Sequence, residues 1–450
     1  MKALAASLIL LAACGGGTAE GGGGPTATDA TGQPIRGAGG EAVSAEAHEH
    51  WSAALALFQR YEQQGWSGHC DEAVDAFEEA NDAQGGRFAE ALYMMGVAAS
   101  RCNDMERARQ MYTRALEANG RLCKARTALG VMDLEAGRQP AAQAAFQRAL
   151  TEDSRCTEAY VNLAIIQRQQ GSPDSAREAL NNLRRALAID AGYLVAFNEM
   201  ALLYLGQAQS NAQMLDLAGV VCRQAQQIDA NYAPIYNTWG LVNVRKGNII
   251  EALRLFERAY TLDNAMFEAH MNFGQITLSF RGYEDARTAF ARAAELRPRD
   301  YDAHIGLGAA LRGLAAIVAD PVERERKMRA EVQPQYELAT QIDANRPESY
   351  FNLGVLYQDY MSGSIEDMQR ARGYFEQFVA KAGRNAQFAQ TVEDVTRRCQ
   401  DAQARPTGRR RRRPTSACRP GRLQNIQTAV ETLQAAAQVT QQAAQQQQNP

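Results

Sequence analysis

Small and bulky residues alternate with polar stretches along most of the chain, and their order repeats. After Gly274, for example, Ala286, Phe290 and Ala293 follow at distances of 12, 16 and 19 residues. Eight small residues open such a series: Gly96, Gly130, Ala164, Ala201, Gly240, Gly274, Gly308 and Gly354. The intervals between them are 34, 34, 37, 39, 34, 34 and 46 residues, which predicts an internal repeat.

The spacing inside each series is helical. Ala286, Phe290 and Ala293 are four and three residues apart, which places their side chains on one helical face. A small residue on the preceding helix would let the two helices approach closely. Because stacked hairpins bury an apolar face that a single hairpin cannot, the pattern predicts an all-α solenoid of about eight to nine helical hairpins.

Extra residues enter the third, fourth and seventh units. The longest insertion spans Leu314 to Arg329, where Asp320-Pro321 is expected to start a new helical turn. Two interpretations remain open: a lengthened helix pair at a turn that tolerates insertion, or a ridge that contacts a specific partner.

The best-formed unit, with Phe273-Gly274, Ala286, Phe290, Ala293 and Pro298, resembles the tetratricopeptide repeat (TPR). The resemblance implies a TPR superhelical solenoid whose concave face binds protein partners. Its segments are eight repeats over residues 89–384, a degenerate hairpin containing Ala73, Phe77 and Ala80 over residues 41–88, and a capping helix over residues 385–403.

The N-terminus has the pattern of an export signal. Residues 1–13 carry Lys2 and a short apolar run, too short to cross a bilayer. The run ends in Leu11-Ala12-Ala13-Cys14, which resembles the lipobox of bacterial lipoproteins; the alternative is an ordinary signal peptide cleaved nearby. The resemblance implies lipidation of Cys14, and Gly15 after it implies an outer-membrane location on the periplasmic face. Residues 14–40, rich in glycine, are then expected to form a flexible tether.

The C-terminus departs from the repeat. Residues 404–422 are rich in arginine, but an exported chain is not expected to bind nucleic acid. A solvated linker and an electrostatic contact with anionic lipid or an acidic partner both remain open. In the helical extension at residues 423–450, Leu423, Ile426, Val430 and Leu433 form a heptad-like stripe, typical of a docking helix; a frayed tail is the alternative.

Seven cysteines follow Cys14, and export to an oxidising compartment favours disulfides. Two pairs are about one repeat apart, and a third would bridge the arginine-rich stretch: Cys70 with Cys102, Cys123 with Cys156, and Cys399 with Cys418. Cys222 takes the place of a bulky core residue and is expected to be buried and free.

Candidate chemistry is sparse. No CxxC, HExxH, GxSxG or GxxxxGK[ST] motif occurs, so no catalytic residue, cofactor or metal site is predicted. His270 and His304 occupy equivalent positions and are expected to pack within their repeats, whereas His48 and His50 are expected at the surface.

The concave face is expected to carry the partner site. Its lining positions, three before, one after and four after each small residue, are mostly apolar, although some could instead pack between hairpins. They are Tyr93, Val97, Val131, Leu134, Val161, Ile165, Leu202, Leu205, Asn237, Leu241, Val244, Met271, Leu278, Ile305, Phe351 and Val355.

The whole chain resembles the TPR-repeat lipoproteins of the myxobacterial gliding-motility machinery. That resemblance implies a non-enzymatic scaffold that binds envelope proteins of a trans-envelope motility complex. A pilotin-like lipoprotein that assists secretin, type IV pilus or barrel assembly is the alternative. A cell-wall enzyme would need a catalytic domain, and residues 381–450 are too short and too biased in composition to form one.

Overall fold

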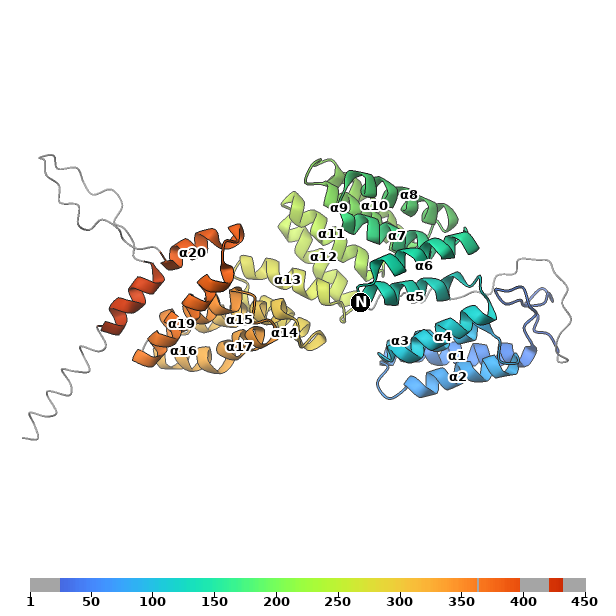
Figure 1. Cartoon of the computed structure of the whole chain (residues 1–450), viewed down its shortest axis with the longest axis horizontal. Helices are drawn as coiled ribbons and strands as arrows, with labels where there is room; N and C mark the ends of the chain where they lie inside the picture. Colours follow the sequence, from blue (N-terminus) through green and yellow to red (C-terminus); the bar gives the residue numbers. More distant parts are fainter. Residues whose placement is uncertain (1–24, 362–363, 397–420, 432–450) are drawn as a thin grey trace, which may run out of the picture. The chain divides into compact units, whose positions relative to one another are not determined.

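The computed structural model describes residues 25–361, 364–396 and 421–431 (Figure 1). Cys14, Cys399, Cys418 and most of the arginine-rich stretch lie outside these residues. The described chain consists of consecutive helical hairpins and divides into two compact units, Met1–Ala230 and Asn231–Pro450. The all-α solenoid predicted from the repeat is therefore confirmed.

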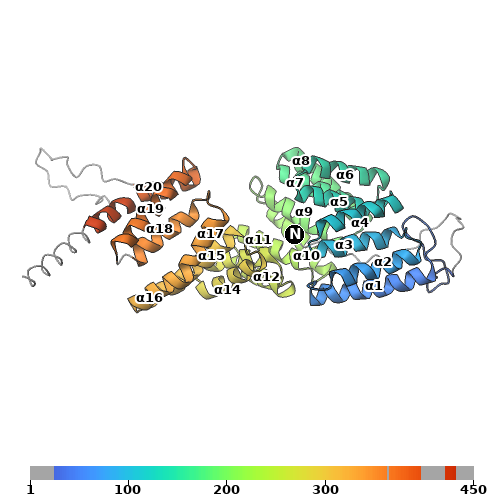
Figure 2. The ribbon, with the colours of Figure 1, turned by 60° about the horizontal axis from the view of Figure 1, so that its bottom comes forward.

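The first unit contains five hairpins. Their helices are α1 Ala45–Gln64, α2 Cys70–Ala83, α3 Ala89–Arg101, α4 Met105–Ala118, α5 Cys123–Glu135, α6 Gln139–Glu152, α7 Thr157–Gln170, α8 Pro173–Ile189, α9 Leu194–Gln207 and α10 Met214–Ile228. Figure 2 shows α1 to α6 stacked side by side in chain order.

In its described residues the second unit contains four hairpins and a C-terminal extension. Its helices are α11 Ala233–Lys246, α12 Ile249–Leu262, α13 Phe267–Ser279, α14 Tyr283–Leu296, α15 Tyr301–Ala316, α16 Pro321–Lys327, the π-helix η1 Met328–Val332, α17 Gln333–Ile342, α18 Glu348–Tyr360, α19 Ile365–Ala382, the 3-10 helix η2 Ala386–Phe388 and α20 Ala389–Thr396.

The hairpins stack with a consistent pattern of contacts. Within each unit, the second helix of a hairpin packs against the first helix of the next, as α6 packs against α7 and α12 against α13. First helices also contact one another directly, as do α5 with α7 and α13 with α15. First helices α5, α7 and α9 of the first unit, and α11, α13 and α15 of the second, therefore each form a layer.

The recurring glycines lie where an aromatic ring leaves no room for a side chain. A Cβ atom added at Gly130 would lie 2.5 Å from the ring of Phe146, and one added at Gly240 would lie 2.5 Å from Phe256. Where the small residue is alanine, the equivalent bulky position holds a non-aromatic residue, Leu183 or Cys222. The repeated spacing of small and bulky residues is thus explained by the close approach of the two helices of a hairpin.

The insertion in the seventh repeat lengthens its hairpin. Asp320 caps α16 by accepting hydrogen bonds from the backbone N–H groups of Val322 and Glu323. The π-helix η1 then leads into α17 and buries Met328 and Val332. As a result Tyr336 still reaches the Gly308 position, where an added Cβ would lie 2.5 Å from its ring. The structure therefore favours the lengthened helix pair.

The flexible tether predicted for residues 14–40 is wrong from residue 25 onwards. Isolated bridges pair Thr26 with Ser44, Thr28 with Pro34, and Arg36 with Ala42. The turns between them use Gly32 and Gly40, whose φ angles of 79° and 86° suit glycine. These glycines are turn residues in a folded segment.

Side chains of the first unit hold this segment in place. The amide of Gln84 bonds the backbone N–H of Ser44 and the backbone carbonyl of Ala42, at 2.9 and 2.8 Å. The carboxylate of Glu90 accepts a hydrogen bond from the backbone N–H of Ala38. Val43 is fully buried in the core that α1 to α5 share.

Candidate partner-binding surface

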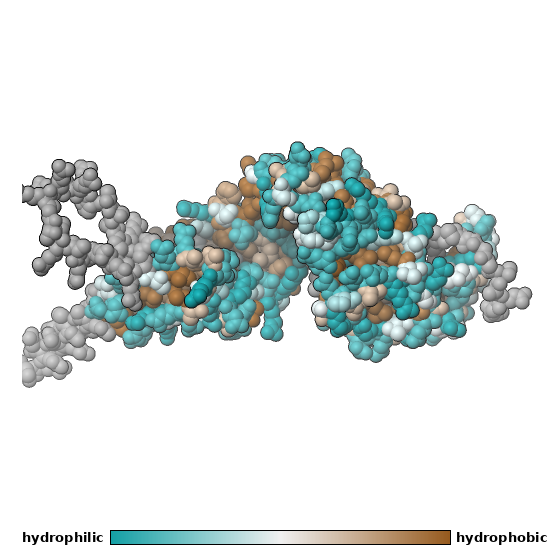
Figure 3. All heavy atoms as spheres, turned by 45° about the horizontal axis from the view of Figure 1, so that its top comes forward, coloured by the Kyte–Doolittle hydropathy of each residue, from teal (hydrophilic) through white to brown (hydrophobic). Residues whose placement is uncertain are grey.

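The layer of first helices is the candidate partner-binding surface. We call it the inner-helix surface: α3, α5, α7 and α9 in the first unit, and α11, α13, α15 and α18 in the second. Successive helices from α5 to α9, and from α11 to α15, contact one another across hairpins, whereas second helices contact mainly the adjoining first helices. These first helices therefore form the inner layer of their stack. In the space-filling view of Figure 3, hydrophilic residues cover most of the visible face and hydrophobic residues gather in smaller patches.

The apolar positions predicted on this surface are not freely exposed. Val97, Val161, Asn237 and Val355 are buried, and the others are half-buried. Met271 and Leu278, for example, pack against the core around Phe290. These side chains therefore contribute to packing between hairpins, and the half-buried ones keep part of their surface available to a partner.

Polar contacts also join neighbouring first helices in the first unit. Arg168 of α7 pairs with Glu199 of α9 at 3.0 Å, and Arg101 of α3 pairs with Glu62 of α1 at 2.6 Å. Burial raises the pKa of Glu199, and the guanidinium of Arg168 opposes that rise. The positive charge of Arg168 thus partly offsets the cost of burying the charged carboxylate of Glu199.

The second unit has equivalent polar contacts. The side-chain amide of Asn272 on α13 donates to Asn237 on α11 at 2.8 Å. The guanidinium of Arg312 on α15 donates to Asn352 on α18 at 3.1 Å. The sequence pattern did not single out Arg168 and Arg312, although both stand four residues after a small residue, because their partners Glu199 and Asn352 lie 31 and 40 residues away.

Two disulfides join neighbouring hairpins of the first unit. Cys70 is bonded to Cys102, and Cys123 to Cys156; these are the pairs that the one-repeat spacing suggested. Cys222 is free and buried, and burial raises its thiol pKa to about 12. The thiol is therefore poorly suited to act as a nucleophile.

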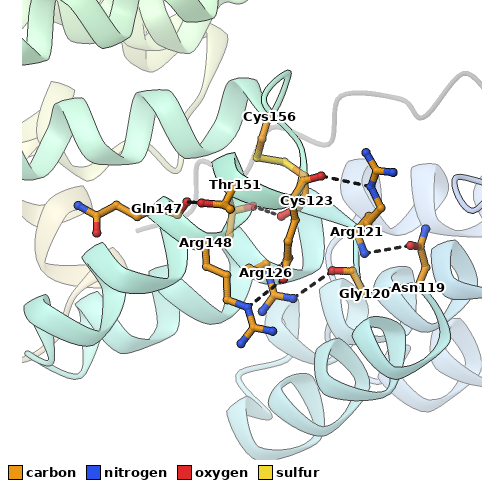
Figure 4. Close-up of polar contacts among 11 residues, drawn as sticks. Asn119, Gly120, Arg121, Cys123, Arg126, Gln147, Arg148, Thr151 and Cys156 are labelled. Carbon is orange, nitrogen blue, oxygen red and sulfur yellow. Dashed lines mark hydrogen bonds and ion pairs between the residues drawn. A yellow bond between two sulfur atoms is a disulfide. The ribbon is translucent and has the colours of Figure 1, made fainter.

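Arginines surround the Cys123–Cys156 bond (Figure 4). Arg126 bonds the carboxylate of Glu152 and, at 3.0 Å, the carbonyl of Gly120. Arg148 reaches the same carboxylate at 2.9 Å, and Arg121 reaches the Glu152 carbonyl at 3.2 Å. The disulfide thus joins the second repeat to the third, and the charged hydrogen bonds join the start of α5 to the end of α6 within the second repeat.

The two equivalent histidines bind the loops that precede their own helices. Nε2 of His270 lies 3.1 Å from the carbonyl of Asn264, and Nε2 of His304 lies 3.0 Å from the carbonyl of Pro298. Both rings are buried. Each histidine therefore fixes the entry to its first helix.

One cluster of the described residues has a metal-ligand composition. One ligand atom each from Cys123, Cys156 and Glu158 lies within 4.8 Å of the others. Because both sulfur atoms are joined in the disulfide, neither is a thiolate ligand in this state. Over the described residues, no helix is long and apolar enough to cross a membrane.

Comparisons with known proteins agree with the repeat. Residues 89–121, 127–193 and 272–315 match tetratricopeptide repeat families. A thermophilic TPR protein of Thermus thermophilus is 26% identical, with a TM-score of 0.38, over 42% of this chain and 98% of that one. The TPR protein YrrB, described as having an unusual peptide-binding site, is 20% identical, with a TM-score of 0.36, over 47% and 98%.

The Cut9–Hcn1 hetero-tetramer of the APC/C matches over 68% of this chain and 55% of that one, at 13% identity and a TM-score of 0.50. No curated protein matches the sequence. The chain thus contains tetratricopeptide repeats in a TPR solenoid. TPR proteins are scaffolds for protein–protein interaction, and the fold is typically not catalytic.

Proposed function

We propose that this protein is a non-enzymatic scaffold, anchored by a lipid on Cys14 to the periplasmic face of the outer membrane. The main support for a periplasmic location is the pair of disulfides between neighbouring hairpins, Cys70–Cys102 and Cys123–Cys156. Such bonds persist in oxidising compartments and are rare in the cytosol. The apolar N-terminal run that ends at Cys14 supports the same compartment.

The anchor has a direct test. Cys14→Ser should move the protein from the membrane fraction to the soluble periplasmic fraction, because lipid chains attached to this thiol would supply the membrane affinity. Arginines in residues 404–422 would add only a salt-sensitive attraction to anionic headgroups. A Cys14→Ser protein that stays in the membrane fraction after a high-salt wash would rule out the proposed anchor.

The inner-helix surface suits a helical or extended partner segment. Its half-buried apolar side chains, such as Leu241 and Val244, would contact apolar anchors of the partner. Paired polar groups such as Asn237 and Asn272 fix the spacing of the helices beneath them. We therefore place the capture of envelope proteins on this surface.

A matched pair of variants tests that placement. Leu241→Glu with Val244→Glu puts two charges on the inner-helix surface of α11 and should abolish partner capture. Ile250→Glu, at a side chain 73% exposed in the same hairpin, is the control and should leave capture intact. Equal helicity by circular dichroism would show that folding is unchanged, and equal capture by both proteins would move the site elsewhere.

The complex that this scaffold serves is proposed to be a trans-envelope motility machinery, on the resemblance of the whole chain to TPR-repeat gliding lipoproteins. Crosslinking in intact cells, followed by purification through a C-terminal tag, would identify the captured proteins. Motility components of both membranes would support the proposal. A secretin or barrel-assembly protein would replace it with a pilotin-like role, and wall-processing enzymes alone would contradict both.

A further inference from the structure

The C-terminal segment returns to the last TPR. We call residues 422–431 the tail helix. Arg422 at its start donates to the side-chain oxygen of Gln358 at 2.7 Å and to both carboxylate oxygens of Asp359 at 3.1 Å. The amide of Gln358 donates in return to the carbonyl of Arg422 at 3.0 Å. Asp394 of α20 adds a second carboxylate 3.8 Å from the guanidinium.

Apolar contacts accompany this charged group. The guanidinium carbon of Arg422 lies 6.0 and 5.7 Å from the ring centroids of Phe351 and Phe375. Ile426 is fully buried in the core of the last repeats, and Leu423 and Val430 pack against that core. The apolar stripe predicted in the sequence is therefore the face with which the tail helix contacts the array.

The tail helix covers part of the inner-helix surface. Phe351 and Gln358 stand three residues before and four residues after Gly354, at two of the three lining positions of the repeat. Elsewhere in the array such positions carry the polar contacts between successive first helices, as between Arg312 and Asn352. In the described residues after α19 no further hairpin packs on α18, and Arg422 supplies an equivalent contact.

The interaction has the features of a reversible one. Helices in proteins gain most of their stability from packing an apolar face, so the tail helix depends on its docked contacts. Among its residues only Ile426 is fully buried. Contacts with Phe351, Gln358 and Asp359 place the tail helix on the array.

We propose that the inner-helix surface of the last repeat is a docking site for an amphipathic helix that begins with arginine and carries apolar residues one, four and eight positions later. The tail helix, with Arg422, Leu423, Ile426 and Val430, closes this site in cis. A partner helix with the same pattern opens it by displacement. This inference rests on the proposed use of the inner-helix surface for partners, but it does not depend on the lipid anchor.

The test uses purified full-length protein and a fluorescein-labelled peptide of residues 421–431. In the unaltered chain the tail helix competes with the peptide. In an Ile426→Asp chain the tail helix loses its buried contact, so the peptide should bind at least tenfold more tightly, measured by fluorescence anisotropy. Gln424→Asp adds the same charge at an exposed position of the same helix and should behave as the unaltered chain does.

Specificity is tested on both sides of the contact. Asp359→Lys in the Ile426→Asp chain, and Arg422→Ala in the peptide, should each weaken binding at least tenfold. If Ile426→Asp lowers the helicity of the array, an Arg422→Ala chain replaces it. The proposal is overturned if the opened and control chains bind the peptide equally, or if neither binds it.

Two further results would also overturn the proposal. A dimer of the unaltered chain that Ile426→Asp dissociates would assign the tail helix to a second copy. An array that melts much earlier when the tail helix is released, and binds no peptide, would make the tail helix a structural cap. Because the assay contains no envelope protein, its failure leaves the capture test on Leu241 and Val244 independent.

Discussion

Equivalent junctions in the two units are held by different chemistry. In the first unit, Cys123 and Cys156 stand seven and eight residues before Gly130 and Ala164, and a disulfide joins them. In the second unit the same two positions, before Gly308 and Gly354, hold Tyr301 and Arg346. The guanidinium of Arg346 lies 3.9 Å from the centroid of the Tyr301 ring.

The second junction is reinforced by ion pairs. Arg346 bonds Asp302 at 2.7 and 3.0 Å and Glu348 at 3.1 Å. A disulfide acts largely by restricting the unfolded chain, whereas an arginine stack acts in the folded state and responds to salt. The repeat therefore determines where neighbouring hairpins meet, but it does not determine whether a disulfide or an arginine–tyrosine contact holds them together.

Loss of the Cys123–Cys156 disulfide is expected to have the largest effect on stability, and to act on the first unit only. Cys123→Ser with Cys156→Ser should lower the free energy of unfolding of the first unit by about 3–4 kcal/mol, from the closure of a loop of roughly 30 residues. Hydrogen exchange should accelerate in α5 to α7 and stay unchanged in α13 to α15. Equal acceleration in both units would show that the bond does not act locally.

Close packing should matter equally in both units. Gly130→Ala and Gly240→Ala should each cost about 1–3 kcal/mol, because the new methyl group meets Phe146 or Phe256. Gly373→Ala in α19 is the matched control; no atom lies within 4 Å of its added Cβ, and it should gain about 0.5–1 kcal/mol. Urea unfolding measures the difference, and a gain at Gly130 or Gly240 would contradict the packing account.

The buried ion pair of the first unit predicts a pH dependence. Arg168→Leu should cost about 1–3 kcal/mol at neutral pH, because Glu199 loses its partner. Without the arginine the pKa of Glu199 rises further, so the loss appears as pH rises through that pKa and shrinks when the carboxyl is protonated in acid. Gln169→Leu, at an exposed position of α7, should show no such dependence in urea titrations from acid to neutral pH.

The smallest predicted effect concerns the arginine junction. Arg346→Ala should cost about 1–2 kcal/mol, through loss of the stack on Tyr301 and of the bidentate bond to Asp302. Thermal unfolding in low and high salt should show a smaller cost at high salt, because these groups are partly exposed. A cost independent of salt would mean that packing, not charge, holds this junction.

The repeat can be predicted well from the sequence because residues at fixed spacings within it are in direct contact. Gly240 leaves the space that the ring of Phe256 fills, and the spacing of Cys123 and Cys156 follows from the same period. These features depend on neighbouring hairpins only. The lipobox at Cys14 and the Cys399–Cys418 pair lie outside the described residues and stay predictions.

Contacts over longer distances in the sequence could not be predicted. The glycine-rich residues 25–40 resemble a tether until Gln84 and Glu90, some 40 to 52 residues away, are seen to hold the segment 25–44. Docking of Ile426 on the last repeat likewise depends on Phe351 and Gln358, which no local pattern connects to it.

The folded N-terminal segment has a mechanical consequence if Cys14 is the anchor. Thr26, the first residue of the paired segment, stands twelve positions after Cys14, so the chain between them can extend at most about 40 Å, against about 95 Å for a chain unpaired up to residue 41. A pull on the membrane side would be borne first by the paired backbone of residues 26–44 and then by the clamps from Gln84 and Glu90. Gln84 at the end of α2 and Glu90 in α3 would therefore share the load with α1, which begins directly after the segment.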